Sequence, residues 1–104
     1  MPRATAKVGN TVLAETDKWE TVEGNVYFPQ SSLKDSTGTF RLIKSDASTF
    51  CPWKGPASYY DIAIHETGTV ISDAAWYYPE PYEAAQNIRD HVAFYKMKVH
   101  VVVE

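Results

Sequence analysis

The chain has 104 residues and a mass of 11.7 kDa, a length that predicts one domain, residues 1–104, with a single hydrophobic core. Hydrophobic residues make up 44% of the sequence and charged residues 22%, proportions that exclude an intrinsically disordered chain. The net charge is −3 and no block of like charges occurs, which argues against a protein that binds nucleic acid through its phosphates.

Short strands separated by turns are predicted for the first thirty residues. Gly9-Asn10 lies between the apolar stretches of "AKVGNTVLAE", and Gly24-Asn25 lies between "WETVE" and "VYFP". Gly-Asn pairs tolerate the positive φ angles of two-residue hairpin loops, so each pair predicts an antiparallel hairpin. Pro29 is expected to end the second hairpin.

The middle of the chain combines a polar segment with a strand of mixed character. The polar segment "QSSLKDSTG" predicts a loop with one helical turn around residues 31–33. In "ASYYDIAIHE", Tyr60, Ile62 and Ile64 alternate with more polar residues, which predicts a strand with one apolar face and one mixed face. We expect the mixed face to line a cavity.

The last third of the chain predicts a strand through residues 70–77, a short helix and a final strand or hairpin. Pro81 fits the first turn of the helix, with Ala84, Ala85 and Ile88 facing inward. Alternating β-branched and aromatic residues in "HVAFY" and "KVHVVVE" indicate strands. The sequence therefore predicts a mainly β (α+β) fold: a small, strongly curved antiparallel sheet or an open β-barrel with one short helix.

The segment "STFCPWKGPASYYDI" carries the clearest indication of a binding site. Its two prolines and its glycine predict a loop of fixed shape. Lys54, flanked by Trp53 and Tyr59, offers an ammonium for a phosphate or carboxylate beside aromatic rings that stack on a ligand. The alternative is an exposed lysine on a surface turn.

Cys51 and Lys54 are the candidates for a catalytic role, and the sequence does not decide whether the protein is an enzyme. Cys51 is a nucleophile only where a cation such as Lys54, His65 or His91 favours its thiolate, and is otherwise a small buried hydrophobe. The spacing of the histidines, which include His100, matches no metal site. We therefore predict no metal and no cofactor.

A second aromatic cluster begins at Trp76. Packing in the core is the simpler interpretation of Tyr77 and Tyr82. Trp76 and Tyr78 lie on the other alternating face of the predicted strand, which leaves packing and ligand binding equally open for them.

These motifs together resemble a known family. "CPWKG" followed by "ASYY", then "AWYYPEP" and "HVAFY", with "VYFP" near residue 27, is similar to the domain of unknown function 427 family over nearly the whole chain. The resemblance implies a small single-domain protein whose signature positions here are Tyr27, Phe28, Pro29, Cys51, Pro52, Lys54, Gly55, Tyr59, Tyr60, Trp76, Tyr78, Pro79 and Pro81.

Two features separate the chain from what the resemblance implies. Charged residues usually follow Tyr-Phe-Pro in the family, whereas "QSSL" follows here, which points to a different ligand. The family also has a provisional nucleotidyltransferase label, but the chain lacks the Asp-x-Asp pair and the phosphate-binding loop that such enzymes use.

Two functions from different classes remain open. In the first, the protein binds a small polar or anionic molecule, such as a sugar, a nucleotide or a related metabolite. An enzyme of this kind needs a general acid or base, for which Glu20, Asp61, His65 and His91 are available. The ligand-binding residues we predict are Tyr27, Lys54, Tyr59, Trp76 and Tyr78. In the second, the chain is a non-catalytic structural or homodimeric interaction protein whose edge strands pair.

The sequence also predicts a cytoplasmic protein that does not interact with membranes. Cys51 is the only cysteine, so no disulfide within the chain and no zinc site of several cysteines can form. "MPRATAKVGN" lacks the apolar stretch of a signal peptide, and "VHVVV" is too short to span a bilayer.

Overall fold

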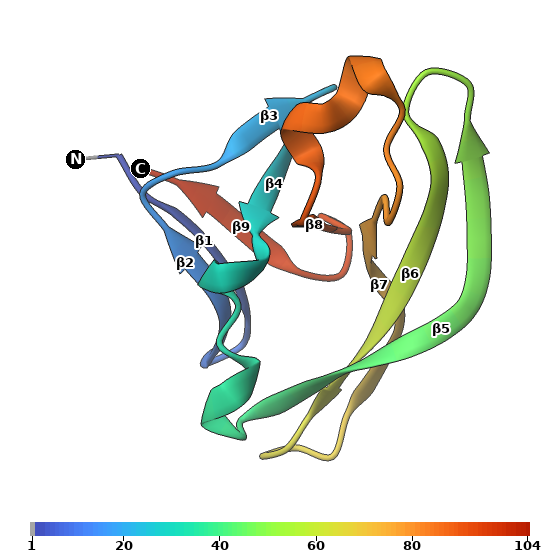
Figure 1. The fold of residues 1–104 in the computed structure, drawn as a ribbon. Coiled ribbons are helices and arrows are strands. Elements are labelled where there is room, and N and C mark those ends of the chain that lie inside the picture. The colour runs from blue at the N-terminus through green and yellow to red at the C-terminus, as the bar shows by residue number, and fades with distance from the viewer. Residues whose placement is uncertain (1) are drawn as a thin grey trace.

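The computed structural model describes residues 2–104, which form short antiparallel strands and 3₁₀ turns (Figure 1). The strands are β1 (Ala4–Val8), β2 (Thr11–Thr16), β3 (Glu20–Val22), β4 (Asn25–Pro29), β5 (Phe40–Cys51), β6 (Gly55–Ile64), β7 (Val70–Tyr77), β8 (His91–Phe94) and β9 (His100–Val103). The 3₁₀ helices are η1 (Gln30–Ser32), η2 (Asp35–Thr37) and η3 (Glu83–Ile88).

The strands form two antiparallel sheets. One has the order β2-β1-β9 and the other the order β3-β4-β8-β7-β6-β5. The six-stranded sheet is strongly curved, and its two end hairpins, β3–β4 and β5–β6, lie at the same end of the molecule with η3 between them (Figure 1). The sheets do not close into a barrel, because β3 and β5 are opposite edges of the larger sheet. The predicted mainly β fold with a curved antiparallel sheet is confirmed.

The two glycine-containing hairpins form as predicted, except that the loop of the second lies one residue earlier in the chain. Val8 pairs with Thr11, so Gly9-Asn10 is the first loop, as predicted. In the second hairpin Asn25 pairs with Val22, and the loop is Glu23-Gly24 rather than Gly24-Asn25. Both loop residues have positive φ, 54° and 79°, as a two-residue hairpin turn requires.

The predicted helix after Pro81 is a 3₁₀ helix that begins at Glu83. Ala85 and Ile88 are buried as expected, but Ala84 is exposed. The helix is interrupted at Ala85, whose φ of −121° and ψ of 20° are not helical, so the single inward face expected of one continuous helix does not form. None of the helices in the described residues is long and apolar enough to cross a membrane.

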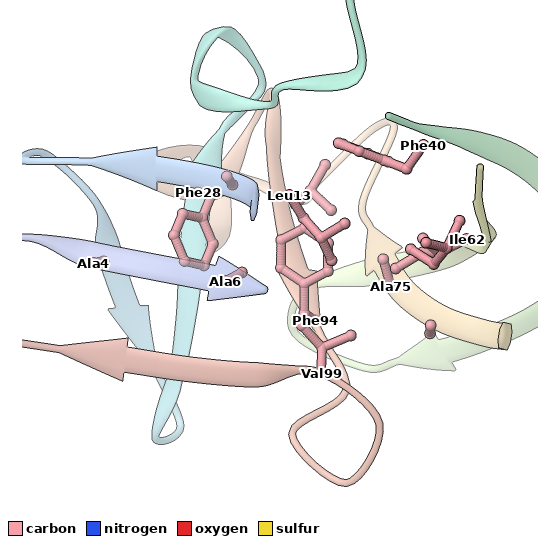
Figure 2. Close-up of a cluster of buried hydrophobic side chains, with 13 residues drawn as sticks. Ala4, Ala6, Leu13, Phe28, Phe40, Ile62, Ala75, Phe94 and Val99 are labelled. Carbon is pink, nitrogen blue, oxygen red and sulfur yellow. The ribbon is translucent and has the colours of Figure 1, made fainter. Parts of the chain in front are cut away.

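The main hydrophobic core lies between the two sheets. Phe28 and Phe94 from the larger sheet pack edge to face, with ring centroids 5.6 Å apart. Ala4, Ala6 and Leu13 from the smaller sheet lie against them (Figure 2). This core fixes the position of one sheet on the other.

The opposite face of the larger sheet carries a second apolar cluster. Side chains alternate between the faces along each strand. On β4, Phe28 belongs to the main core and Tyr27 to the second cluster; on β8, Phe94 and Ala93 are divided in the same way. Ala85 and Ile88 of η3 cover the second cluster.

Candidate functional site

The second cluster gathers residues from β4, β6, β8, η3 and the end of β7, which are far apart in sequence. Tyr27, Tyr59, Trp76 and Tyr78 all belong to it or pack against it. Lys54 lies beside it, with its ammonium 5.4 Å from the centre of the Tyr78 ring. The five residues predicted to bind a ligand therefore lie on one side of the larger sheet.

Lys54 is buried although it sits in a turn, with only 6% of its surface exposed. Its Nζ donates a hydrogen bond to the Glu23 carboxylate and forms an ion pair with it. The ammonium also lies 5.3 Å from the centre of the Trp53 ring, at a distance where the ring attracts a cation. The alternative of an exposed surface lysine is wrong for this position.

The Lys54 ammonium stays protonated at neutral pH. Burial by itself lowers the pKa of Lys54, but the hydrogen bond to Glu23 and the nearby Tyr27 and Tyr78 hydroxyls outweigh it and hold the pKa above its usual value. The hydrogen bond and charge of Lys54 lower the pKa of Glu23. Burial raises the pKa of Tyr78, which keeps that phenol neutral.

Tyr27 and Trp76 contact each other directly within the cluster. The Trp76 indole Nε1 donates a 3.2 Å hydrogen bond to the hydroxyl of Tyr27, and the two rings meet edge to face with centroids 6.3 Å apart. The Tyr95 ring also packs edge to face with Trp76, with centroids 6.4 Å apart. Since Tyr27 accepts the indole proton, its own O–H remains available as a donor.

Tyr59 and Cys51 lie at the side of the cluster. The Tyr59 hydroxyl is 3.0 Å from Thr49 Oγ1 on β5, within hydrogen-bonding distance. Cys51, at the end of β5, is partly buried and packs against the cluster. We predicted Tyr59 as a neighbour of the Lys54 ammonium, but the rings that approach it are those of Trp53 and Tyr78.

The Glu23–Lys54 pair joins the two ends of the larger sheet. Glu23 is in the β3–β4 turn and Lys54 in the β5–β6 turn, and these hairpins stand at opposite ends of the strand order. The segment around η3, orange in Figure 1, bridges the same gap. Tyr82 N donates to Lys54 O at 2.9 Å, and Asn87 Nδ2 donates to Glu20 Oε1 at 3.1 Å.

The predicted acid and base candidates are engaged in local contacts. Glu20 is paired across the β3–β4 hairpin with Tyr27, and its carboxylate accepts the Asn87 bond. Asp61 Oδ1 accepts the backbone N–H of Asp73 at 2.8 Å, and His91 Nδ1 lies 2.7 Å from the carbonyl of Arg89. Glu20 lies on the cluster side of the sheet, because it is directly opposite Tyr27 in the β3–β4 ladder.

Open clefts occur elsewhere on the surface. One of about 460 Å³ lies at the seam between the sheets and includes Glu15, Lys34, His65 and Glu66. Another of about 440 Å³ includes Trp19, Glu20 and His91. Neither contains a residue of the predicted ligand set. Within residues 2–104 no group of three or more His, Cys, Asp or Glu side chains could hold a metal ion.

Glu23 and Tyr95 belong to the site but were not predicted from the sequence. Glu23 comes next to Lys54 only because the larger sheet curves until its end hairpins meet. Tyr95 follows β8 directly and packs on Trp76 because β7 and β8 pair, with Trp76 opposite Ala93. The one available signal for Glu23 was its position beside Gly24 in a predicted hairpin.

The ion pair gives stability a defined pH dependence. The pKa of Glu23 is lower in the folded protein than the usual 4.5, so the stabilisation is present above that value and is lost as the pH falls through the folded pKa. The raised pKa of Lys54 leaves its contribution intact until strongly alkaline pH. Urea denaturation should show Glu23→Gln less stable than wild type at neutral pH, with the difference shrinking at about pH 3. A difference that does not change with pH contradicts the pair.

Comparison with protein families gives a match over nearly the whole chain. A family model described as "Domain of unknown function (DUF427)", with the label NTP_transf_9, matches residues 2–104. A search of curated proteins found no match to the chain.

Proposed function

The chain belongs to the DUF427 family, whose function is unknown, and from its site we propose that it binds a small polar or anionic molecule, such as a sugar, a nucleotide or a related metabolite. The binding residues are Lys54, which holds the anionic or polar group, and Tyr27, Tyr59, Trp76 and Tyr78, which contribute ring faces and hydroxyl groups. A small-molecule ligand is therefore the expected partner.

The observation that carries the proposal is the environment of the Lys54 ammonium. A lysine is rarely this buried unless a partner compensates its charge. Here the partner is a glutamate whose side chain is 52% exposed, while that of Lys54 is 8% exposed. The Lys54 ammonium is thus buried, and the group that neutralises it is the carboxylate of an exposed glutamate. Such an arrangement suits an anion-binding site.

The protonation of Lys54 favours an anchoring role over nucleophilic catalysis. An amine must lose its proton before it attacks a carbonyl, and enzymes achieve this by lowering the lysine pKa. The pKa of Lys54 is raised instead. We therefore propose binding as the activity, with Lys54 as the anchor of the ligand.

A ligand screen on two variants tests this function. Thermal melting of wild type and Lys54→Met is measured with nucleotides, sugar phosphates and neutral sugars. At about a hundred times its dissociation constant a ligand adds roughly 2.7 kcal/mol, and each kcal/mol raises the midpoint by about 4–8 °C in a domain of this size. The shift with wild type is expected to vanish in Lys54→Met, because methionine keeps much of the length of the side chain but not its charge.

Lys34→Met is the matched control, since Lys34 lines the cleft between the sheets instead. It should keep the wild-type shift. A shift that survives in Lys54→Met but disappears in Lys34→Met moves the site to that cleft, and a protein that no ligand stabilises contradicts the proposal.

A homodimeric interaction protein is the second candidate, and the β5 edge favours it. β5 is twelve residues long and has a strand partner, β6, on one side only within the described sheet. Phe50 near its end is 64% exposed and meets Tyr82 edge to face at 6.3 Å. Light scattering during gel filtration decides it: a dimer that Phe50→Ser dissociates supports this function. For either function we propose a cytoplasmic location, in keeping with a single free cysteine.

A further inference from the structure

We infer that the Glu23 carboxylate occupies the anion position of the site, and that the ligand is a carboxylate on an apolar or aromatic body that displaces it. This inference rests on the proposed function and adds the class of ligand and the residue it competes with. In the structure, the Glu23 carboxylate takes the place at the Lys54 ammonium that the ligand would occupy.

The location of Glu23 suits a displaceable group. It lies at the tip of the β3–β4 hairpin, and β3 is a three-residue strand at the edge of its sheet. The main chain at Lys54 is held in place, since its carbonyl accepts a bond from Tyr82 N, and its side chain is buried. The ion pair therefore joins a buried ammonium on an anchored turn to a carboxylate on an exposed hairpin tip, and the carboxylate is the partner that a ligand can displace.

The backbone at Glu23 indicates that its carboxylate matters. The residue has a φ of 54°, in the left-handed region that Gly, Asn and Asp adopt more readily than Glu in hairpin turns. A glutamate is not the choice that the turn itself favours. Its side chain, by contrast, is long enough to reach Lys54 across the gap between the two hairpins.

The charge of the site sets the charge of the ligand. Lys54 supplies one ammonium, and one carboxylate satisfies it. The nearby Lys96 Nζ donates a 3.0 Å hydrogen bond to the carbonyl of Gly24 and not to the Glu23 carboxylate. A monoanion therefore fits the exchange better than a polyphosphate, which needs several cations or a metal.

The residues around the Lys54 ammonium indicate which chemical group the ligand carries beside its carboxylate. Trp53, which the ammonium approaches, is 40% exposed. Tyr82, whose N–H bonds the Lys54 carbonyl, is 44% exposed and carries Phe50 at its edge. Exposed rings beside a charged anchor favour a ligand with a flat apolar part, because such a ligand covers them while its carboxylate is held.

Calorimetric titration of four proteins with three probes tests this inference. The proteins are wild type, Glu23→Gln, Lys54→Met and Glu83→Gln, the last removing an exposed glutamate of η3 as a control of equal charge change. The probes are benzoate, its neutral analogue benzamide, and inorganic phosphate. Removing the internal competitor raises the fraction of molecules ready to bind, so Glu23→Gln should bind benzoate about tenfold more tightly than wild type. Glu83→Gln should match wild type, Lys54→Met should not bind, and benzamide should bind to none.

The outcomes separate this inference from the proposed function. Equal benzoate affinity in wild type and Glu23→Gln, with no binding by Lys54→Met, leaves the Lys54 site in place but overturns the displacement of Glu23. Binding of phosphate in preference to benzoate overturns the carboxylate class. If the ligand screen finds a Lys54-dependent ligand of another class and benzoate binds to no variant, the inference alone fails. Amide NMR shifts of Gly24 give an independent readout, because displacement moves the hairpin tip and simple docking beside it does not.

Discussion

Replacing Phe94 by alanine is expected to lower the free energy of unfolding by about 3–5 kcal/mol. Phe94 is 2% exposed and packs edge to face on Phe28, in the core that joins the two sheets (Figure 2). The substitution removes a large apolar side chain and leaves a cavity that β-sheet neighbours cannot fill by small movements. Urea denaturation measures the loss, and the melting temperature should fall by about 12 °C or more.

Met97→Ala is the control for this prediction. Met97 is 87% exposed in the turn after β8, so its truncation should change stability by no more than about 0.5 kcal/mol. A Phe94→Ala protein that unfolds outright agrees with the prediction, since domains of this size have only about 5–15 kcal/mol of stability. A loss below about 1 kcal/mol contradicts it and places the main core elsewhere.

Gly55→Ala is expected to cost about 2–3 kcal/mol and to disturb the candidate site as well. Gly55 has a φ of 107°, where L-residues with a Cβ are strained. An added Cβ would also come within 3.3 Å of the Glu80 carbonyl oxygen and of the Tyr82 ring. The alanine therefore pushes away the segment that bonds the carbonyl of Lys54, which should weaken ligand binding together with stability.

Gly68→Ala separates strain from contact. Gly68 has a φ of 69°, and a Cβ added there would meet no heavy atom within 4 Å. Alanine at this position should therefore cost only the backbone strain, about 1–2 kcal/mol. Equal losses for the two variants in urea denaturation would show that the Tyr82 contact has no energetic weight. If Gly55→Ala binds the ligand as tightly as wild type, the segment before η3 that contains Glu80 and Tyr82 does not contribute to ligand binding.

Much of the fold followed from local sequence. Gly9-Asn10 marked the first hairpin because a glycine at positive φ is what a two-residue loop needs. The second hairpin was predicted one residue too late, because the same dipeptide pattern does not reveal that Asn25 pairs with Val22 in the ladder. The helix expected after Pro81 is a short 3₁₀ segment interrupted at Ala85, and the expectation that Ala84 faces inward failed because a kinked segment has no single continuous face.

The sequence indicated which aromatic residues share a face of the sheet, but not how they are arranged around Lys54. Tyr27, Trp76 and Tyr78 lie together because side chains alternate along β4 and β7, which the sequence displays directly. The burial of Lys54 was not predictable, since a lysine beside a glycine and two prolines in a turn is ordinarily exposed. That these residues bind a ligand stays a prediction for the experiments above.

The sequence by itself determined the strand-rich class, the membership of the family and which residues share a face of the larger sheet, because composition, motifs and a period of two are local properties. Only the tertiary structure decided that the β3–β4 and β5–β6 hairpins meet and that Glu23 pairs with Lys54, thirty-one positions further along the chain. That contact depends on the order and the curvature of six strands, which arise from packing across the whole core rather than from any one segment.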